Sequence, residues 1–559
     1  MKQDNNYGRV SIPESISKTT KITTPVYDYN SNKYRKTETI TEESSKEANF
    51  YPLKSQLKSK EFGNLNKIDN IYKEKKQKSI YKVPLSVEVC IRSNINLTQD
   101  EANSNESQLS RKYLTQRIKK YFSLQANVGL GKVDIDQIGD SMLRKVCTDI
   151  NLSLNYPIHS IEEKHNDSNN NNNCKSNSIN QREDHENIPI YQAEFNIYIY
   201  QLNDMSEEEY YMESNTSGEK STDPPIWRYW SLPNIEFHGL WDVLHYENNL
   251  KQQLLDYTST SLILSDCQID FNVINWNHLI LLYGSPGTGK TSISRAISQK
   301  IGMRYCNRYK NIYLIEISAH SLFSKWFSES GKTVVKLFSK IKSLLEEPDS
   351  FVNIVIDEIE SISTARKQSL GRNEPSDSIR VVNALLTQID ALKKYSNTLI
   401  MTTTNIPDSI DEAFLDRADL KLHIPLPSLY TRYTILLECI EELIFKQVIY
   451  SRHDDYIKIL TFKEIIKHSN VNINKNDHVN YTEITQNKNQ NNYDHFQLNI
   501  SKDLLYISKV TDGFSGRNLR KLPFVSLLSS YHHGIPLEIE IFLEKMKYIV
   551  NEKPEMVKS

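Results

Sequence analysis

Residues 279–291 read Leu-Ile-Leu-Leu-Tyr-Gly-Ser-Pro-Gly-Thr-Gly-Lys-Thr, an apolar run that passes directly into a glycine-rich loop. The apolar run predicts a buried strand, and residues 292–297 after the loop are compatible with a helix. Glycines at three positions let backbone N–H groups converge on an anion, and the helix directs its positive end at the same point. The pattern GxxxxGK[ST], placed between a strand and a helix, therefore predicts a binding site for the phosphates of a nucleoside triphosphate.

Individual side chains of this loop have separate roles in such a site. Lys290 can reach the β- and γ-phosphates of ATP, and the hydroxyl of Thr291 can bind Mg²⁺. The alternative is a chance glycine-rich turn, which neither the complete pattern nor the strand in front of it favours. The residues predicted to bind ATP are Gly284, Ser285, Pro286, Gly287, Thr288, Gly289, Lys290, Thr291 and Ser292.

A nucleoside triphosphatase also needs acids that organise the metal ion and the attacking water. Residues 351–358 read Phe-Val-Asn-Ile-Val-Ile-Asp-Glu, and this β-branched run is typical of a buried parallel strand. Asp357 at its end would hold Mg²⁺ through water, and Glu358 would polarise the attacking water. Two acids after a strand are common in isolation, but a position 67 residues after Lys290 in an alternating strand–helix pattern favours the catalytic role.

Two further polar residues follow the next predicted strand, residues 398–404. Asn405 would orient the lytic water against the γ-phosphate, although a lone Asn after a strand is usually a turn former. Arg417, flanked by Asp416 and Asp419, would reach the γ-phosphate of a neighbouring subunit if it is unpaired. The alternative for Arg417 is a local surface pair with one of these acids, worth about 0–1 kcal/mol.

The last motif lies near the C-terminus, where residues 512–520 read Asp-Gly-Phe-Ser-Gly-Arg-Asn-Leu-Arg. Ser515 or Gly516 suits the start of a helix, and Arg517 on its first turn can face the nucleotide from a separate lid. In this order the motifs resemble the pattern of AAA+ ATPases. That resemblance implies an α/β fold with a parallel sheet, a helical lid, and a ligand at the carboxyl ends of the strands.

One aromatic pair lies in the stretch that lines the central pore in AAA+ proteins. Residues 318–332 read Ser-Ala-His-Ser-Leu-Phe-Ser-Lys-Trp-Phe-Ser-Glu-Ser-Gly-Lys. Trp326 and Phe327 can grip an extended polypeptide through apolar contact. Two adjacent aromatics at a helix start are more often part of a core, and this alternative stays open on the motif alone.

Several longer motifs resemble the pachytene checkpoint protein 2 family of AAA+ ATPases. These are residues 321–332, 373–377, 379–384, 414–419 and 515–524, with Glu236-Phe237-His238-Gly239-Leu240-Trp241 and Leu254-Leu255-Asp256-Tyr257 upstream. The resemblance implies that Leu240 and Trp241 pack against adenine. It also implies a homohexameric ATPase that partly unfolds HORMA-domain proteins with the help of a HORMA adaptor, at meiotic chromosome axes and in the spindle checkpoint.

Two rival functions are compatible with the motifs. In the first, the protein is a nucleotide-gated binding module in which ATP only sets shape; the presence of both carboxylates favours an enzyme. In the second, it is a general AAA+ remodeller of the severing or complex-disassembly type. Those relatives usually carry a three-helix bundle or a double-ψ barrel at the N-terminus, and residues 80–225 show the pattern of neither.

Composition limits the remaining possibilities. The 559 residues are too many for one core, and a formal net charge of −2 argues against a nucleic-acid partner. The six cysteines show no C-x-x-C spacing, and we find neither a secretory signal nor a run long enough to span a membrane. A reducing cytosol or nucleus follows, and the client that the resemblance implies favours the nucleus.

The chain is expected to contain four parts. Residues 1–79 lack periodicity and are predicted to be disordered, with a charge run at 73–78 that is either a nuclear import signal or a solvated surface. Residues 80–228 form a small α/β domain that engages adaptor and client, interrupted by an Asn-rich loop. Residues 229–427 form the ATPase domain. Residues 428–559 form the lid, with helices expected at 431–450, 456–468, 504–533 and 537–550 and a polar insertion at about 468–497.

Overall fold

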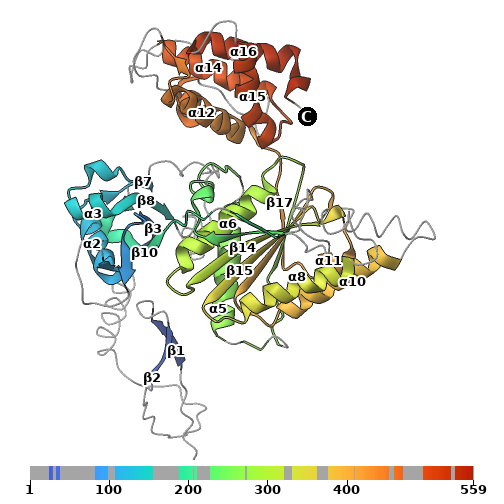
Figure 1. The fold of residues 1–559 in the computed structure, drawn as a ribbon. Helices are drawn as coiled ribbons and strands as arrows, with labels where there is room; N and C mark the ends of the chain where they lie inside the picture. The colour runs from blue at the N-terminus through green and yellow to red at the C-terminus, as the bar shows by residue number, and fades with distance from the viewer. Residues whose placement is uncertain are drawn as a thin grey trace, which may run out of the picture. The chain divides into compact units, whose positions relative to one another are not determined.

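The computed structural model divides into two compact units, Met1–Ile80 and Tyr81–Ser559 (Figure 1). In the first unit it describes only two antiparallel strands, β1 (Thr24–Asp28) and β2 (Lys33–Thr37). The rest of residues 1–79, the range predicted to be disordered, lies outside the described residues. In the second unit the described residues are 82–98, 108–154, 188–205, 207–210, 227–247, 249–267, 269–270, 273–319, 330–361, 376–407, 410–451, 459–469, 495–530 and 536–557.

The N-terminal domain is a four-stranded sheet covered by helices. Its strand order is β10-β3-β8-β7, with β10 parallel to β3 and β8 antiparallel to it. Ile118 and Phe122 of the main helix are buried, and the Phe122 ring stacks on Phe195 at 5.2 Å. The elements are β3 (Val83–Ile91), β4 (Asn96–Thr98), β5 (Gln108–Ser110), α2 (Arg111–Ser123), β6 (Asn127–Val128), β7 (Gly131–Lys132), α3 (Ser141–Val146), β8 (Cys147–Leu154), β9 (Ile188–Pro189) and β10 (Ala193–Gln201).

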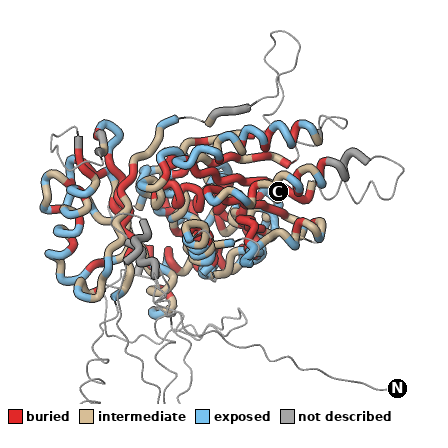
Figure 2. The backbone as a smooth tube through the Cα atoms, turned by 90° about the horizontal axis from the view of Figure 1, so that it is seen from below, coloured by how far each residue is buried: buried red, intermediate tan, exposed pale blue. Residues whose placement is uncertain are grey.

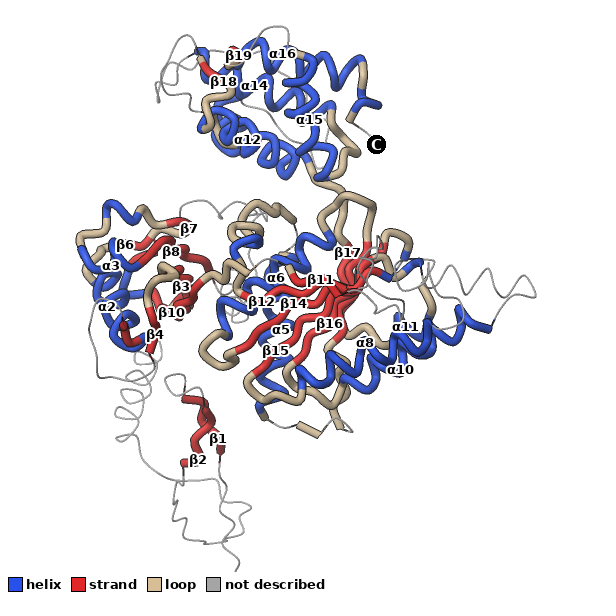
Figure 3. Tube along the Cα trace, viewed as in Figure 1, coloured by secondary structure: helices blue, strands red, loops and turns tan. Residues whose placement is uncertain are grey.

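The large domain is built on a seven-stranded sheet of order β11-β12-β14-β15-β16-β13-β17 (Figure 3). The last five strands are parallel, whereas β11 and β12 add an antiparallel edge. Strand β11 and the first two residues of β12 fall within residues 80–228, the range predicted for the N-terminal domain, but both strands extend this sheet instead. The strands are β11 (Glu208–Tyr210), β12 (Trp227–Leu232), β13 (Leu279–Tyr283), β14 (Asn311–Ser318), β15 (Ser350–Asp357), β16 (Thr398–Thr404) and β17 (Leu420–His423).

Helices cover both faces of this sheet. Helices α8 (Ser330–Leu345) and α10 (Ser376–Leu392) pack on one face, and α5 (Leu250–Asp266) and α6 (Lys290–Tyr305) pack on the other. The strands are therefore buried on both sides, as continuous apolar runs such as residues 279–283 require (Figure 2). A short helix, α11 (Glu412–Leu415), precedes β17.

Helix α6 also joins the large domain to the N-terminal domain. Lys300 and Arg304 near its end form ion pairs with Glu88 of β3, and the Arg304–Glu88 distance is 3.3 Å. The three side chains are 5%, 12% and 1% exposed, respectively. The helix that begins at the phosphate loop therefore ends at a buried ionic contact with the other domain.

The lid is a helical domain with its own core. It contains α12 (Leu429–Phe445), β18 (Ile449–Tyr450), α13 (Phe462–Ser469), α14 (His495–Val510), α15 (Gly516–Ser529), β19 (Leu537–Glu538) and α16 (Ile539–Glu552). Along the described helices of the chain, none is long and apolar enough to cross a bilayer.

Three of the predicted lid helices have other boundaries in the structure, and two of them end just before a residue with positive φ although the apolar periodicity continues. The helix expected at 431–450 ends at Phe445, since Gln447 takes a left-handed φ of 57°. The helix expected at 504–533 is the end of α14 and all of α15, separated by a turn in which Gly513 has φ 73°. The helix expected at 456–468 begins only at Phe462 within the described residues. Most of the polar insertion lies outside the described residues.

Candidate active site

The phosphate loop leaves β13 in the interior of the sheet and ends where α6 begins. The Gly284 N–H donates to the Thr404 carbonyl at the end of β16, at 3.3 Å. Helix α6 starts at Lys290, with Gly289 before it in a left-handed conformation (φ 94°). The strand, loop and helix predicted from residues 279–297 are therefore present, with the positive end of α6 at the loop.

Two positions of the loop must be glycine, because neighbouring side chains leave no room for a Cβ atom. A Cβ atom on Gly287 would lie 2.7 Å from the hydroxyl of Ser515 in the lid, and one on Gly289 would lie 2.5 Å from the hydroxyl of Tyr246. Both have positive φ values, 77° and 94°. The loop is therefore enclosed between the lid and the segment that precedes α5, and any side chain at either position would push one of them away.

Lys290 lies inside the loop. Its ammonium donates to the carbonyl oxygens of Gly284 at 2.9 Å and Ser285 at 2.8 Å, and the residue is 6% exposed. Burial lowers the pKa of Lys290, and the charges of Glu360 and Asp357 oppose that effect. A cation held at the centre of an anion-binding loop suits the β- and γ-phosphates.

Thr291 and Asp357 meet beside the loop, as expected for two ligands of one metal ion. The Thr291 hydroxyl donates to the carboxylate of Asp357 at 3.0 Å, and Thr403 of β16 also donates to it. Mg²⁺ in phosphate sites commonly takes one or two protein oxygens together with phosphate oxygens. Within the described residues, no group of three or more acids, histidines or cysteines is arranged to hold a metal ion. Phosphate oxygens and water would complete the coordination of an ion held by Thr291 and Asp357.

Glu358 has an uncommon backbone conformation for a residue that is not glycine. Its φ is 58°, and its N–H donates to the Thr403 hydroxyl at 3.2 Å. A left-handed residue directly after a strand turns the chain sharply. Strain of this kind is often found at functional sites and costs about 1–3 kcal/mol. The adjacent acids Asp357 and Glu358 thus differ in backbone geometry, with only Asp357 in the strand.

Asn405 is fixed by an acid that the sequence motifs did not single out. Its side-chain amide donates to Glu360 at 2.8 Å, and its backbone N–H donates to the same oxygen at 3.2 Å. Glu360 is 9% exposed and contributes to the electrostatic environment of Lys290. The signal that could have found Glu360 is the spacing of acids in Asp357-Glu358-Ile359-Glu360, which places a third carboxylate at the same end of β15.

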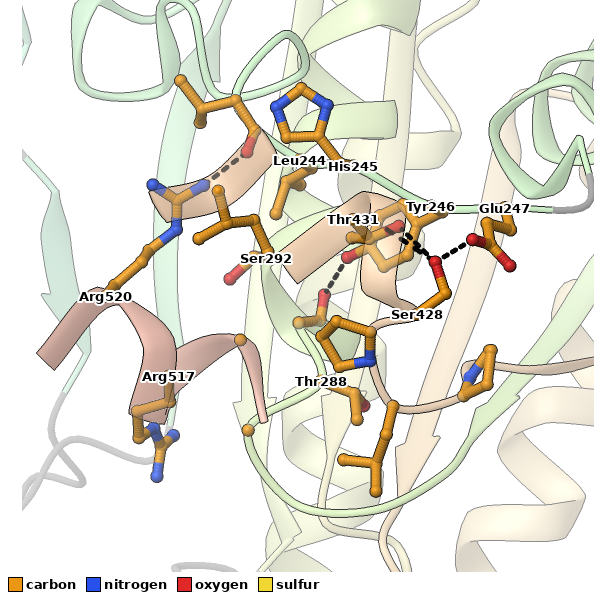
Figure 4. Close-up of a pocket in the computed structure, with 18 residues that line it drawn as sticks. Leu244, His245, Tyr246, Glu247, Thr288, Ser292, Ser428, Thr431, Arg517 and Arg520 are labelled. Carbon is orange, nitrogen blue, oxygen red and sulfur yellow. Dashed lines mark hydrogen bonds between the residues drawn. The ribbon is translucent and has the colours of Figure 1, made fainter. Parts of the chain in front are cut away.

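A pocket opens next to the phosphate loop between the large domain and the lid (Figure 4). Its walls come from residues 243–247, the loop residues 287–289 with Ser292, the connection 425–428, and residues of α12 and α15 in the lid. Arg517 lines this pocket, and its N–H donates to the Gly287 carbonyl at 3.1 Å. This N–H is that of the Arg517 backbone, so it places the residue beside the phosphate loop, and the predicted contact of its side chain with the nucleotide stays a prediction.

Residues 243–247, rather than Leu240 and Trp241, line the pocket where the nucleotide base would lie. Trp241 faces the other way: the ammonium groups of Lys251 and Lys300 lie 5.2 and 5.7 Å from its ring. Leu240 and Trp241 pack against the core on the α5–α6 side of the sheet. Leu240 and Trp241 are thus not among the residues that line this pocket, and their predicted contact with adenine stays a prediction.

Tyr246 connects this base-binding segment, residues 243–247, to the phosphate loop. Its hydroxyl donates to the Gly289 carbonyl at 3.1 Å, and burial raises the pKa of the phenol. The segment belongs to none of the motifs that carry the family resemblance, so the sequence analysis did not single it out.

Comparison with known proteins agrees with this geometry. The family model "ATPase family associated with various cellular activities (AAA)" matches residues 280–426, and the "TRIP13-like, AAA+ ATPase lid C-terminal domain" matches residues 428–554. The pachytene checkpoint protein 2 homologs of Rattus norvegicus and Homo sapiens are each 42% identical over 359 residues, which cover 64% of this chain and 76% of theirs. The Arabidopsis thaliana homolog is 44% identical over 337 residues, or 59% of this chain and 68% of its own.

The chain belongs to the pachytene checkpoint protein 2 family. As a member of that family it is an AAA+ ATPase. The solved structure of C. elegans PCH-2 has the same fold: it aligns with a TM-score of 0.57 and 24% identity, covering 85% of this chain and 100% of that one. The AAA+ fold class and the family resemblance expected from the motifs are both confirmed.

Arg417 is not unpaired in this member of the family. Its guanidinium forms two hydrogen bonds with Asp390 of α10, at 2.8 and 2.9 Å. The two flanking acids are not its partners; Asp419 instead accepts from Asn277 and Tyr257, each at 2.7 Å. The acid that pairs with Arg417 is therefore Asp390 rather than Asp416 or Asp419, which corrects the alternative offered above, and the role of Arg417 at a neighbouring subunit stays a prediction.

The aromatic pair Trp326-Phe327 lies outside the described residues. The described chain stops at Ala319, directly after β14, and resumes at α8. The pore-loop role of the pair therefore stays a prediction.

Proposed function

We propose that this ATPase assembles as a homohexamer and uses ATP hydrolysis to unfold HORMA-domain proteins in part, with a HORMA adaptor, in the nucleus. The proposal rests on one observation: similarity to pachytene checkpoint proteins 2 extends at 42% identity across 359 residues. A family-specific lid match supports it, because that match separates the chain from AAA+ proteins at large.

In the proposed reaction each residue of the site has a separate role. Thr291 and Asp357 would hold Mg²⁺, which neutralises phosphate charge when bound. Lys290 and Arg517 bind phosphate oxygens from the loop and from the lid. Glu358 accepts a proton from the attacking water, and Asn405, fixed by Glu360, orients that water.

The role of Arg417 in this scheme requires it to change partners. It would leave Asp390 and reach the γ-phosphate of a neighbouring subunit. The Arg417–Asp390 pair is partly exposed, with side chains 27% and 36% accessible, so water can solvate both charges when the pair separates. Mixing Arg417→Ala with Lys290→Ala subunits tests this, since a shared site should recover part of the activity. No recovery at any ratio would assign Arg417 a purely local role.

Phosphate release measured with the full chain tests the catalytic assignment. Glu358→Gln should bind ATP with near-normal affinity and lose hydrolysis by about 10²–10⁴-fold, the usual contribution of a general base. Wild-type rates in this variant would refute the catalytic role of Glu358.

The same Glu358→Gln variant tests the client. Incubated with ATP and a recombinant HORMA-domain protein from the same organism, it should retain that protein in a complex of ring size. Retention of tubulin or membrane-fusion subunits in place of the HORMA protein would favour the general-remodeller alternative.

Trp326 and Phe327 would grip the client in this function. Trp326→Ala should leave basal hydrolysis within severalfold of wild type and abolish stimulation by the HORMA protein. A large fall in melting temperature with loss of nucleotide binding would instead indicate a core residue, since such truncations cost about 3–5 kcal/mol in a core.

A further inference from the structure

Two lid helices contact the base-binding segment at the mouth of the pocket. Arg520 of α15 donates to the carbonyl oxygen of Val243 at 2.5 Å (Figure 4). Glu438 of α12 lies 2.6 Å from Nε2 of His245. The same arginine lies 3.8 Å from the second carboxylate oxygen of Glu438, so the two lid residues form one charged group.

This group lies between the two ends of the nucleotide site. Val243 and His245 belong to the segment that lines the base pocket, whereas Arg517, three residues before Arg520, contacts the phosphate loop. Helix α15 therefore contacts the base-binding segment through the side chain of Arg520 and the phosphate loop through the backbone N–H of Arg517 in its first turn.

We propose that Glu438 and Arg520 are positioning residues that couple occupancy of the base pocket to the orientation of the lid. When a base fixes the backbone of residues 243–247, the Val243 carbonyl and the His245 imidazole present fixed partners to the lid. Arg520 and Glu438 then hold α15 so that Arg517 meets the phosphates. A ligand that has phosphates but no base would leave this connection unused.

The exposure of these side chains suits a contact that forms and releases. His245 is 24% exposed, Glu438 33% and Arg520 40%. At such sites an ion pair contributes modestly, and its opening leaves no charge in an apolar environment. The contact can therefore change with nucleotide state.

The test compares two ligands by equilibrium binding to the full chain: Mg·ATP, and magnesium tripolyphosphate, which lacks the base. His245→Gln and Glu438→Gln should each weaken ATP binding by about three- to tenfold and change tripolyphosphate binding by less than about twofold. Glu442→Gln is the matched control, since this acid lies on the same helix and pairs only loosely with Lys446 at 3.9 Å; both affinities should be unchanged.

A reversed pair separates coupling from damage to the fold. The double variant His245→Glu with Glu438→His should bind ATP within about twofold of wild type, provided that the pair itself matters. Equal losses for both ligands would overturn the proposal by showing a general defect of the site. The proposal would also be overturned if both single variants kept the ATP affinity and the melting temperature of wild type. That result would show that the contact does not contribute to ATP binding. Because binding is the readout, the result does not depend on HORMA remodelling.

Discussion

Two groups of ionisable side chains join the large domain to the other parts of the chain, and they differ mainly in burial. Glu88, Lys300 and Arg304 meet at the end of α6 with exposures of 1%, 5% and 12%. His245, Glu438 and Arg520 meet at the pocket mouth with exposures of 24%, 33% and 40%. The chemistry is similar, but the surrounding dielectric is not.

This difference separates a permanent joint from a reversible one. Burial raises the pKa of Glu88, but Lys300 and Arg304 outweigh that effect and hold its pKa below the usual value. Glu88 therefore stays ionised at neutral pH, and separating it from its partners would leave charges buried without compensation. The contacts at the lid carry no such penalty. The N-terminal domain is thus expected to move with α6, while the lid opens and closes.

The largest expected effect is in the buried group. Glu88→Ala leaves Lys300 and Arg304 buried without a counter-charge, and we expect a loss of about 3–5 kcal/mol in the stability of the N-terminal joint. Thermal melting followed by calorimetry should show a separate transition at lower temperature. By contrast, Glu438→Ala should change stability by less than about 1 kcal/mol.

A triple replacement sharpens this prediction. Glu88→Met with Lys300→Met and Arg304→Met removes all three charges and fills similar volume, so it should be more stable than Glu88→Ala alone. A triple variant as unstable as the single one would show that the three side chains stabilise the joint mainly through packing.

The next largest expected effect is the pH dependence of stability that comes from His278, the residue directly before β13. Burial lowers the pKa of His278 to about 4, while the charge of Asp419 opposes that effect. The unfolded chain binds a proton near pH 6.5 and the folded chain does not. The stability from neutral His278 is therefore complete above about pH 6.5 and falls by up to about 3 kcal/mol as the pH drops to 4.

His278→Asn isolates this contribution. Asparagine tolerates the left-handed backbone at this position, where φ is 55°, and it does not titrate. Urea unfolding of the large domain should depend less on pH in the variant between 6.5 and 4. Parallel pH profiles for variant and wild type would contradict the prediction.

The features predicted most accurately from the sequence are those formed by residues that are neighbours along the chain. The strand, glycine loop and helix of residues 279–297 follow one another directly, so their pattern specifies both fold and chemistry. Asp357 was placed correctly beside Thr291 because parallel strands end at one edge of the sheet. The family resemblance, carried by extended motifs, was also correct.

Side chains that pair across long stretches of sequence could not be predicted from sequence motifs. Asp390 pairs with Arg417 from 27 residues away, and nothing in the sequence distinguishes it from the flanking acids. The adenine contact of Trp241 was predicted from the family resemblance, and in the structure the Trp241 ring lies near Lys300. Residues 243–247 belong to none of the motifs, so the sequence did not single them out.

The smallest expected effect is the response of the two groups to salt. A double-mutant cycle on His245 and Glu438, read as ATP affinity, should give a coupling of about 0.5–1 kcal/mol at 0.05 M salt. At about 0.5 M salt the Debye length falls to roughly 4 Å, and this coupling should approach zero. The cycle cancels the salt dependence of ATP binding itself, because all four proteins share it. The corresponding cycle on Glu88 and Lys300, read as melting temperature, should change little, since buried pairs are screened much less. Equal salt responses in the two cycles would mean that burial does not distinguish the joint from the lid contact, and the division into permanent and reversible contacts would fail.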